Sequence, residues 1–222
     1  MERTIRVTGK GKISVTPDTI RLLITQTSVE PTYEGAIHES AERKNELNAA
    51  LSRLGFKKED LKTLYFDVNT EYESYQAKDK SWKRRLEGYK YTHRMKLELP
   101  KDNEMLGKLL GVVSKITGEL KFSLQYTIAN PVEAKNELLA KAVEDSKAKA
   151  HVLTGAAGVE LGGILTIDYS WGEVDFITRP TGDVMLRECC EYDDCEDRSI
   201  DIDIEADDID VTDTVTVVWA IK

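Results

Sequence analysis

Three cysteines lie close together in an acidic stretch, and their spacing is the first feature that could do chemistry. Cys189, Cys190 and Cys195 could supply soft metal ligands or a redox switch. Zinc sites usually carry paired C-x-x-C motifs and a fourth ligand, and neighbouring carboxylates disfavour the thiolate form. We therefore expect free thiols and no bound metal. A metal- or redox-responsive stress protein that uses this cluster is the alternative function.

Alternating acidic residues follow the cysteines and raise the question of a calcium site. A calcium-binding EF-hand loop that began at Asp201 would need glycine at its sixth position and an acid at its twelfth, where the chain has Ala206 and Thr212. The alternation with isoleucines favours a solvated strand face instead. Asp201, Asp203 and Glu205 are thus weak metal candidates only, and we expect no cofactor.

The histidines and hydroxyl residues give little sign of catalysis. His38, His93 and His151 are far apart in the sequence, and His93 falls on an otherwise apolar strand face. A structural role is therefore favoured over a general-base role. No serine or cysteine lies in a recognisable nucleophile motif, so we predict that the protein is not an enzyme.

The sequence Gly9-Lys10-Gly11-Lys12 superficially suggests a phosphate-binding turn. Such a turn needs a helix amino terminus directly after it, whereas Ile13-Ser14-Val15 continues as a strand. The two glycines therefore predict a β-bulge or a tight hairpin closed by Pro17-Asp18.

A basic segment and an acidic segment stand out in a chain of net charge −9. Residues 78–85 hold five bases and one acid, and residues 187–213 carry an excess charge of −11. The negative overall charge argues against nucleic acid as a partner. We predict that the basic tip meets the acidic segment of a neighbouring subunit, with four interface candidates: Trp82, Lys83, Arg84 and Arg85.

These residues must be positioned by an α+β fold. Capping residues predict helices that begin after Thr32, Asp102 and Asn130. Small residues dominate one face of the third helix and predict that it packs closely on a sheet or another helix; this face comprises Leu139, Ala142, Ser146, Ala150, Leu153 and Ala157. Alternating apolar residues predict strands near 5–15, 20–29, 64–75, 89–99, 120–128, 161–171 and 211–221. We expect mostly antiparallel sheets packed with about three helices, in loosely repeated strand-helix-strand units.

Length and hydropathy bound the organisation of the chain. The 222 residues suffice for one large domain, and we expect a single domain over 1–222 with an acidic loop or insertion at about 172–210. No apolar run approaches the roughly 20 residues that span a bilayer, and the first residues lack the layout of a secretory signal. A cytoplasmic protein without a membrane span is therefore expected.

Several motifs together resemble the SIMPL domain family, whose members include bacterial envelope proteins. They are Val7-x-Gly9-x-Gly11, Pro17-Asp18, the Gly55 turn with Glu59-Asp60-x-x-Thr63, Gly88-Tyr89, and the alanine-spaced helix that runs into Gly158-x-x-Leu161-Gly162. The resemblance implies a fold and self-association, without catalytic residues to transfer. We therefore expect a homo-oligomeric scaffold or interaction module, with a further protein partner of unknown identity.

Overall fold

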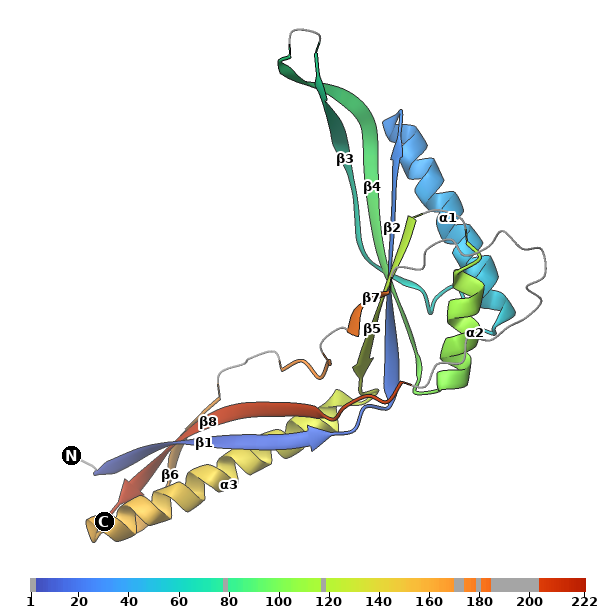
Figure 1. Ribbon diagram of the computed structural model, residues 1–222. Helices are drawn as coiled ribbons and strands as arrows, with labels where there is room; N and C mark the ends of the chain where they lie inside the picture. The colour runs from blue at the N-terminus through green and yellow to red at the C-terminus, as the bar shows by residue number, and fades with distance from the viewer. Residues whose placement is uncertain (1–2, 78–79, 117–118, 170–173, 179–180, 185–203) are drawn as a thin grey trace. The chain divides into compact units, whose positions relative to one another are not determined.

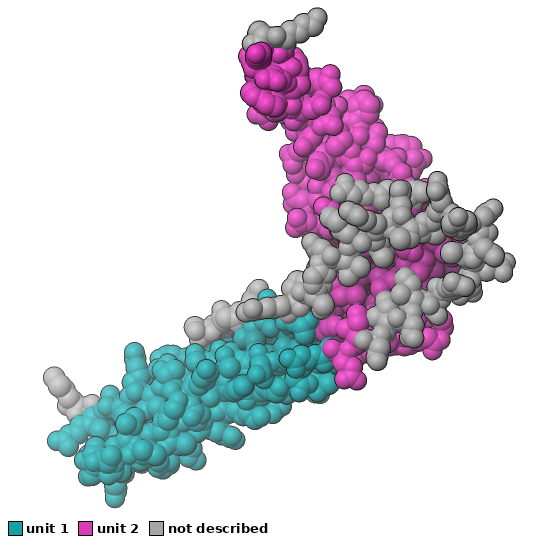
Figure 2. All heavy atoms as spheres, in the orientation of Figure 1, with its two compact units in different colours: residues 1–18, 127–178, 206–222 teal, residues 19–126, 179–205 magenta. Residues whose placement is uncertain are grey.

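The computed structural model describes residues 3–77, 80–116, 119–169, 174–178, 181–184 and 204–222 (Figure 1). The chain forms two compact units, which Figure 2 distinguishes by colour. Unit 1 comprises residues 1–18, 127–178 and 206–222, and unit 2 comprises residues 19–126 and 179–205. Unit 1 is therefore built from three separate segments of the sequence.

Unit 1 is an antiparallel three-stranded sheet with one long helix packed against it (Figure 1). The strand order is β1 (Thr4–Val15), β8 (Ile209–Ile221) and β6 (Leu161–Asp168), and the helix is α3 (Pro131–Ala157). β1 and β8 pair without a break, from Thr4 opposite Ala220 to Val15 opposite Ile209. The first strand of the chain thus pairs with the last strand of the structure and lies in a different sheet from β2.

Helix α3 begins and ends where the sequence predicts. The Asn130 side chain accepts a hydrogen bond from the Val132 N–H, Pro131 occupies the first turn, and Gly158 closes the helix in the left-handed region with φ 68°. Its buried residues recur every four positions: Ala134, Leu138, Ala142, Ser146, Ala150 and Thr154. The prediction of a closely packed small-residue face is confirmed for Ala142, Ser146 and Ala150. Leu153 and Ala157, predicted on the same face, are exposed, because the buried row continues from Ala150 to Thr154.

The glycines of β1 are the counterpart of that small-residue face, and the predicted bulge or hairpin is wrong. A Cβ atom on Gly9 would lie 1.9 Å from the Ala142 carbonyl oxygen, and one on Gly11 would lie 2.1 Å from the Leu138 carbonyl oxygen. β1 is regular at both positions. The glycines are needed because the α3 backbone touches the strand backbone, where any side chain would collide.

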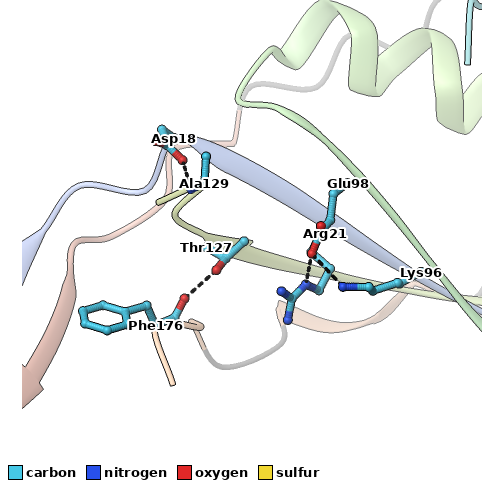
Figure 3. Close-up of polar contacts among 7 residues, drawn as sticks. All are labelled: Asp18, Arg21, Lys96, Glu98, Thr127, Ala129 and Phe176. Atoms are coloured by element: carbon cyan, nitrogen blue, oxygen red, sulfur yellow. Dashed lines mark hydrogen bonds and ion pairs between the residues drawn. The ribbon is translucent and has the colours of Figure 1, made fainter. Parts of the chain in front are cut away.

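Two apolar clusters form among the described residues of unit 1. Val7, Ala142, Ala150, Val217 and Trp219 belong to one of them. The other contains Ile13, Ile128, Ala134, Leu138, Phe176, Ile209 and Val211. Polar contacts fix the segments beside it, because the Asp18 carboxylate accepts from the Ala129 N–H at 2.8 Å and the Thr127 hydroxyl donates to the Phe176 carbonyl at 2.7 Å (Figure 3).

Unit 2 is a five-stranded sheet in the order β3-β4-β2-β5-β7. Its strands are β2 (Thr19–Glu30), β3 (Lys62–Gln76), β4 (Trp82–Pro100), β5 (Glu119–Thr127, whose last residue is counted with unit 1) and β7 (Thr181–Val184). Helices α1 (Tyr33–Arg53) and α2 (Asn103–Val113) follow β2 and β4. The successive elements β2-α1-β3 and β4-α2-β5 match the predicted repeat of strand-helix-strand units.

One face of the paired strands β2 and β4 is buried and the other is polar. Ile20, Leu22 and Ile24 of β2 lie opposite Leu99, Leu97 and Met95 of β4, and all six are buried. On the polar face, Glu98 accepts from Arg21 Nε at 2.8 Å and from Lys96 Nζ at 3.1 Å (Figure 3). Although burial acts to raise it, these hydrogen bonds lower the pKa of Glu98.

The predicted class, α+β with antiparallel sheets, is confirmed. Two further local expectations differ from the structure. The segment predicted as a loop contains the short strand β7, and residues 204–208, predicted as a strand face, are not in a strand. Among the described residues, no helix has both the length and the apolar character needed to cross a membrane.

Candidate functional site

The hairpin of β3 and β4 continues beyond the rest of its sheet as a two-stranded ribbon (Figure 1). β2 ends at Glu30, which lies opposite Tyr89, whereas β3 and β4 remain paired as far as Gln76 and Trp82. We use the name "ribbon" for residues 71–76 and 82–88. Its side chains have no third strand beside them in the described sheet.

The ribbon has one apolar face and one charged face. Directly opposed residues share a face, which places Leu86 beside Tyr72 and Trp82 beside Gln76. Trp82 is 74% exposed and Leu86 is 49% exposed. The Arg84 guanidinium lies 5.2 Å from the centre of the Tyr72 ring, on the same face. This face therefore presents aromatic and aliphatic surface together with a cation.

The opposite face of the ribbon is held together by charge. Arg85 donates to the Glu73 carboxylate at 2.6 Å, and its guanidinium lies 5.8 Å from the centre of the Tyr75 ring. Lys83 pairs in register with Tyr75 on this face. The four predicted interface residues, Trp82 to Arg85, thus all lie on the exposed ribbon but divide between its two faces.

Apolar exposure continues along β3 outside the ribbon. Leu64, Tyr65 and Phe66 are all exposed, the last at 44%. β3 is the first strand in the sheet order and has one strand neighbour in the described sheet. Alternation in the sequence predicted a strand near 64–75 but not the exposure of these residues. Exposure at this edge was missed because the alternation does not say which strand lies at the end of a sheet.

The acidic partner predicted for the ribbon lies largely outside the described residues, which omit 185–203. In the described part, Glu205, Asp207 and Asp208 are exposed. Asp210 forms an ion pair with Lys12 at 3.1 Å on neighbouring strands of unit 1. A contact between the ribbon and the acidic segment of another subunit stays a prediction.

His93 is the centre of a polar network between α1 and the sheet of unit 2. Its Nδ1 is hydrogen-bonded to the buried Ser40 hydroxyl at 3.0 Å, and its Nε2 to the Thr63 hydroxyl at 2.9 Å. Lys44 Nζ donates to the same Thr63 oxygen at 3.1 Å. The network therefore joins α1, β3 and β4 through side chains. Sequence reasoning placed His93 on a buried face but did not identify Ser40, Lys44 or Thr63 as its partners.

Burial, followed by the nearby positive charge of Lys44, lowers the pKa of His93 to about 4. The imidazole is therefore neutral at pH 7, so one ring nitrogen donates and the other accepts. Gln26 lies directly across the strands from His93 and is only 2% exposed, without a hydrogen-bond partner for its amide group. A buried neutral imidazole with this low pKa is a weak base, which fits a network that fixes α1 on the sheet.

The metal candidates give no assembled site. Cys189, Cys190, Cys195, Asp201 and Asp203 lie outside the described residues, and Glu205 is exposed. Within the described ranges, no group of three or more histidine, cysteine or acidic side chains is placed to hold a metal ion. The other two histidines are exposed on helices, His38 on α1 and His151 on α3.

Comparison with known proteins agrees with the resemblance noted in the sequence. The model of the SIMPL family, described as a protein of unknown function (DUF541), matches residues 5–219. This match includes segments of both units. No curated protein matches the chain. Because the family model covers nearly the whole sequence, the chain belongs to the SIMPL family.

Proposed function

We propose that this SIMPL protein is a non-enzymatic interaction module that self-associates through β3 and the ribbon. The observation that carries the proposal is the exposed apolar face of a two-stranded ribbon, with Tyr72, Trp82 and Leu86 on its surface. A two-stranded ribbon is marginally stable in water. Covering its apolar face stabilises the ribbon and supplies association energy at the same time.

The available energy is sufficient for a specific contact. Fully burying a large apolar side chain contributes about 1.5–3 kcal/mol, and aromatic residues and arginine dominate binding energy at protein interfaces. The ribbon displays Trp82, Tyr72 and Arg84 together on one face. Charge pairs at the rim add mainly orientation and rate.

Sedimentation velocity over a range of concentrations tests the proposal. We expect the full chain to associate, and the double change Tyr72→Ser with Trp82→Ser to weaken association at least 10-fold. Val152→Ser is the matched control, because Val152 is 71% exposed on α3 and lies outside the ribbon. A chain that stays monomeric at every concentration, or a ribbon variant that associates as well as the control, would refute the proposal.

The basic residues of the ribbon allow a second, electrostatic test of the proposal. If the bases meet the acidic segment of another subunit, association weakens as salt is raised from low to high concentration, because exposed pairs are screened. Changing Lys83, Arg84 and Arg85 together to glutamate weakens it further at low salt. If association changes with neither salt nor charge reversal, the predicted charge contact is wrong, and the proposed apolar contact is unaffected.

The alternative, a metal- or redox-responsive protein, has its own test. Elemental analysis of the purified chain would show stoichiometric zinc or calcium if the acidic cysteine segment held a metal. We expect none, and we expect the triple change of Cys189, Cys190 and Cys195 to serine to leave folding and subunit number unaltered. Loss of a metal, or of an oxidation-dependent change in assembly, in that variant would favour the alternative.

A further inference from the structure

We infer that two copies of the chain pair their β3 strands edge to edge, antiparallel, with Val68 of one copy opposite Val68 of the other. The inference rests on the proposed self-association and specifies the geometry of its β3 part, beside the ribbon. It follows from three properties of β3: an edge without a second strand neighbour in the described sheet, a backbone that can pair along its length, and a charge pattern that selects one register.

The edge of β3 is suited to strand pairing. The strand is 15 residues long, has β4 as its neighbour in the described sheet, and contains neither proline nor glycine. Every residue therefore carries a backbone N–H, and in an antiparallel ladder alternate residues direct their N–H and C=O groups to the side away from β4. Natural proteins usually protect such edges with proline, bulges or inward-pointing charges. Here the residues from Tyr65 to Gln76 follow one another without a bulge on β3 itself.

Symmetry restricts how two identical edges can meet. Two antiparallel β3 strands in one continuous sheet are related by a two-fold axis perpendicular to that sheet. Residues directly opposite each other then share a face, and the axis passes midway between one residue and its own copy on the other strand. Each register is therefore named by its central residue.

Opposed carboxylates exclude the neighbouring registers. A centre on Asp67 places that carboxylate against its own copy, and a centre on Asn69 places Asp67 opposite Glu71. A register centred on any residue from 70 to 73 likewise places one acidic side chain of β3 opposite another. A centre on Val68 opposes none of them.

The remaining registers pair little of the strand. In a register centred on Phe66, the pairing reaches the irregularity at Leu64 only two residues from the centre. Registers centred on Ser74 or later residues pair only the end of β3. The register about Val68 pairs the regular stretch from Tyr65 to Glu71 with itself. It is therefore the register that combines length with an absence of like charges.

This register also creates favourable neighbours. Asp67 lies opposite Asn69 of the second copy, and the relation occurs twice by symmetry, so two amides face two carboxylates. Within one chain the Asn69 amide already donates to Asp67, which shows that the two groups lie on the same face. The exposed ring of Phe66 comes to lie opposite Thr70, and its apolar surface is partly removed from water.

Cysteine cross-linking tests the register directly. In the full chain with Cys189, Cys190 and Cys195 changed to serine, Val68→Cys brings two thiols to opposed positions, where Cβ atoms are about 4.5–5.5 Å apart and a disulfide is close to its required geometry. Thr70→Cys is the control, because its two copies are separated by four residues along the ladder, about 13–14 Å. We expect mild oxidation to give a covalent dimer with Val68→Cys and none with Thr70→Cys.

A charge pair at Asn69 provides a second test that does not depend on disulfide geometry. Asn69→Lys sets a cation opposite Asp67 of the second copy twice, and Asn69→Asp sets a carboxylate there. We expect a difference of about 2- to 30-fold between the two dimer dissociation constants, with the lysine variant tighter. Within one chain Asn69 lies opposite Lys90 and beside Asp67, whose charges have opposite effects on each change.

The outcomes separate the register from the proposed function. Dimers that form normally but cross-link through Thr70→Cys, or that respond to Asn69→Asp and Asn69→Lys alike, overturn the register and leave self-association intact. A chain that remains monomeric overturns both. A covalent dimer through Val68→Cys together with tighter association of Asn69→Lys supports the pairing.

Discussion

Replacing Gly9 with alanine tests how closely α3 is seated on β1. The added Cβ would lie 1.9 Å from the Ala142 carbonyl oxygen and 2.5 Å from the Ser146 backbone nitrogen, so strand and helix must move apart by about 1.1 Å to reach even a 3.0 Å contact. Both obstacles are backbone atoms and cannot rotate away. The strain therefore reaches the whole interface between α3 and β1.

The expected loss of stability depends on the packing and the hydrogen bonds that this movement disturbs. Overpacking costs about 1–3 kcal/mol, and each lost hydrogen bond adds about 0.5–1.5 kcal/mol. Three such bonds join α3 to β1 among the described residues: the Ser146 hydroxyl donates to the Val7 carbonyl at 3.2 Å, the Lys10 N–H donates to Asp145 at 2.7 Å, and Lys149 Nζ donates to the Thr8 carbonyl at 3.4 Å. We expect a loss of about 3 kcal/mol or more and a melting temperature lower by about 6–12 °C.

Thermal and urea unfolding followed by circular dichroism measure the effect. Gly155→Ala is the control, because a Cβ there has no neighbour within 4 Å and the residue is helical. It should stabilise the protein by up to about 1 kcal/mol. If Gly9→Ala unfolds within about 0.5 kcal/mol of the unchanged protein, the backbone contact does not exist as described.

Two further predictions concern buried side chains. Ala150 is fully buried against the cluster that includes Val217 and Trp219, so Ala150→Leu should overpack it and lower the free energy of unfolding by about 1–3 kcal/mol, which urea titration measures; unchanged stability contradicts this packing. The folded structure lowers the pKa of His93 from 6.5 to about 4. Between these two pH values the unfolded chain binds more protons than the folded chain, so the free energy of unfolding falls as the pH is lowered. The total loss reaches up to about 3 kcal/mol below pH 4. Urea unfolding at pH 7 and pH 4.5 should show this loss in the unchanged protein and not in His93→Gln; an equal pH dependence in both assigns it to other groups.

Local signals in the sequence predicted the elements well. Thr32, Asp102 and Asn130 each cap a helix, as expected from a short polar side chain that accepts backbone N–H bonds. Alternation located the long strands because one face of each central strand is buried. These features depend on neighbours within a few residues along the chain.

The features that the sequence left open depend on distant partners. Two glycines in a strand are compatible with a bulge or with close approach of another backbone, and only the position of α3 distinguishes them. The polar partners of His93 come from α1 and β3, far from it in the sequence. The ribbon residues were identified by charge and by Trp82, but their division between two faces required the register of β3 and β4.

The pairing of β1 with β8 has a consequence for how the protein is made. Thr8 bonds to Thr216 across 208 positions of sequence, so on the ribosome β1 has no strand partner until β8 has emerged. The first segment of unit 2 runs from Thr19 to Tyr126 and contains most of the strands of that unit. These strands are therefore synthesised long before β8. Closing so long a loop is slow, and a folded unit 2 shortens it by bringing Asp18 within hydrogen-bonding distance of Thr127, at 3.2 Å. Vectorial synthesis thus leaves the glycine-bearing strand without this partner until β8 is made, and unit 1 is completed after most of unit 2 has been synthesised.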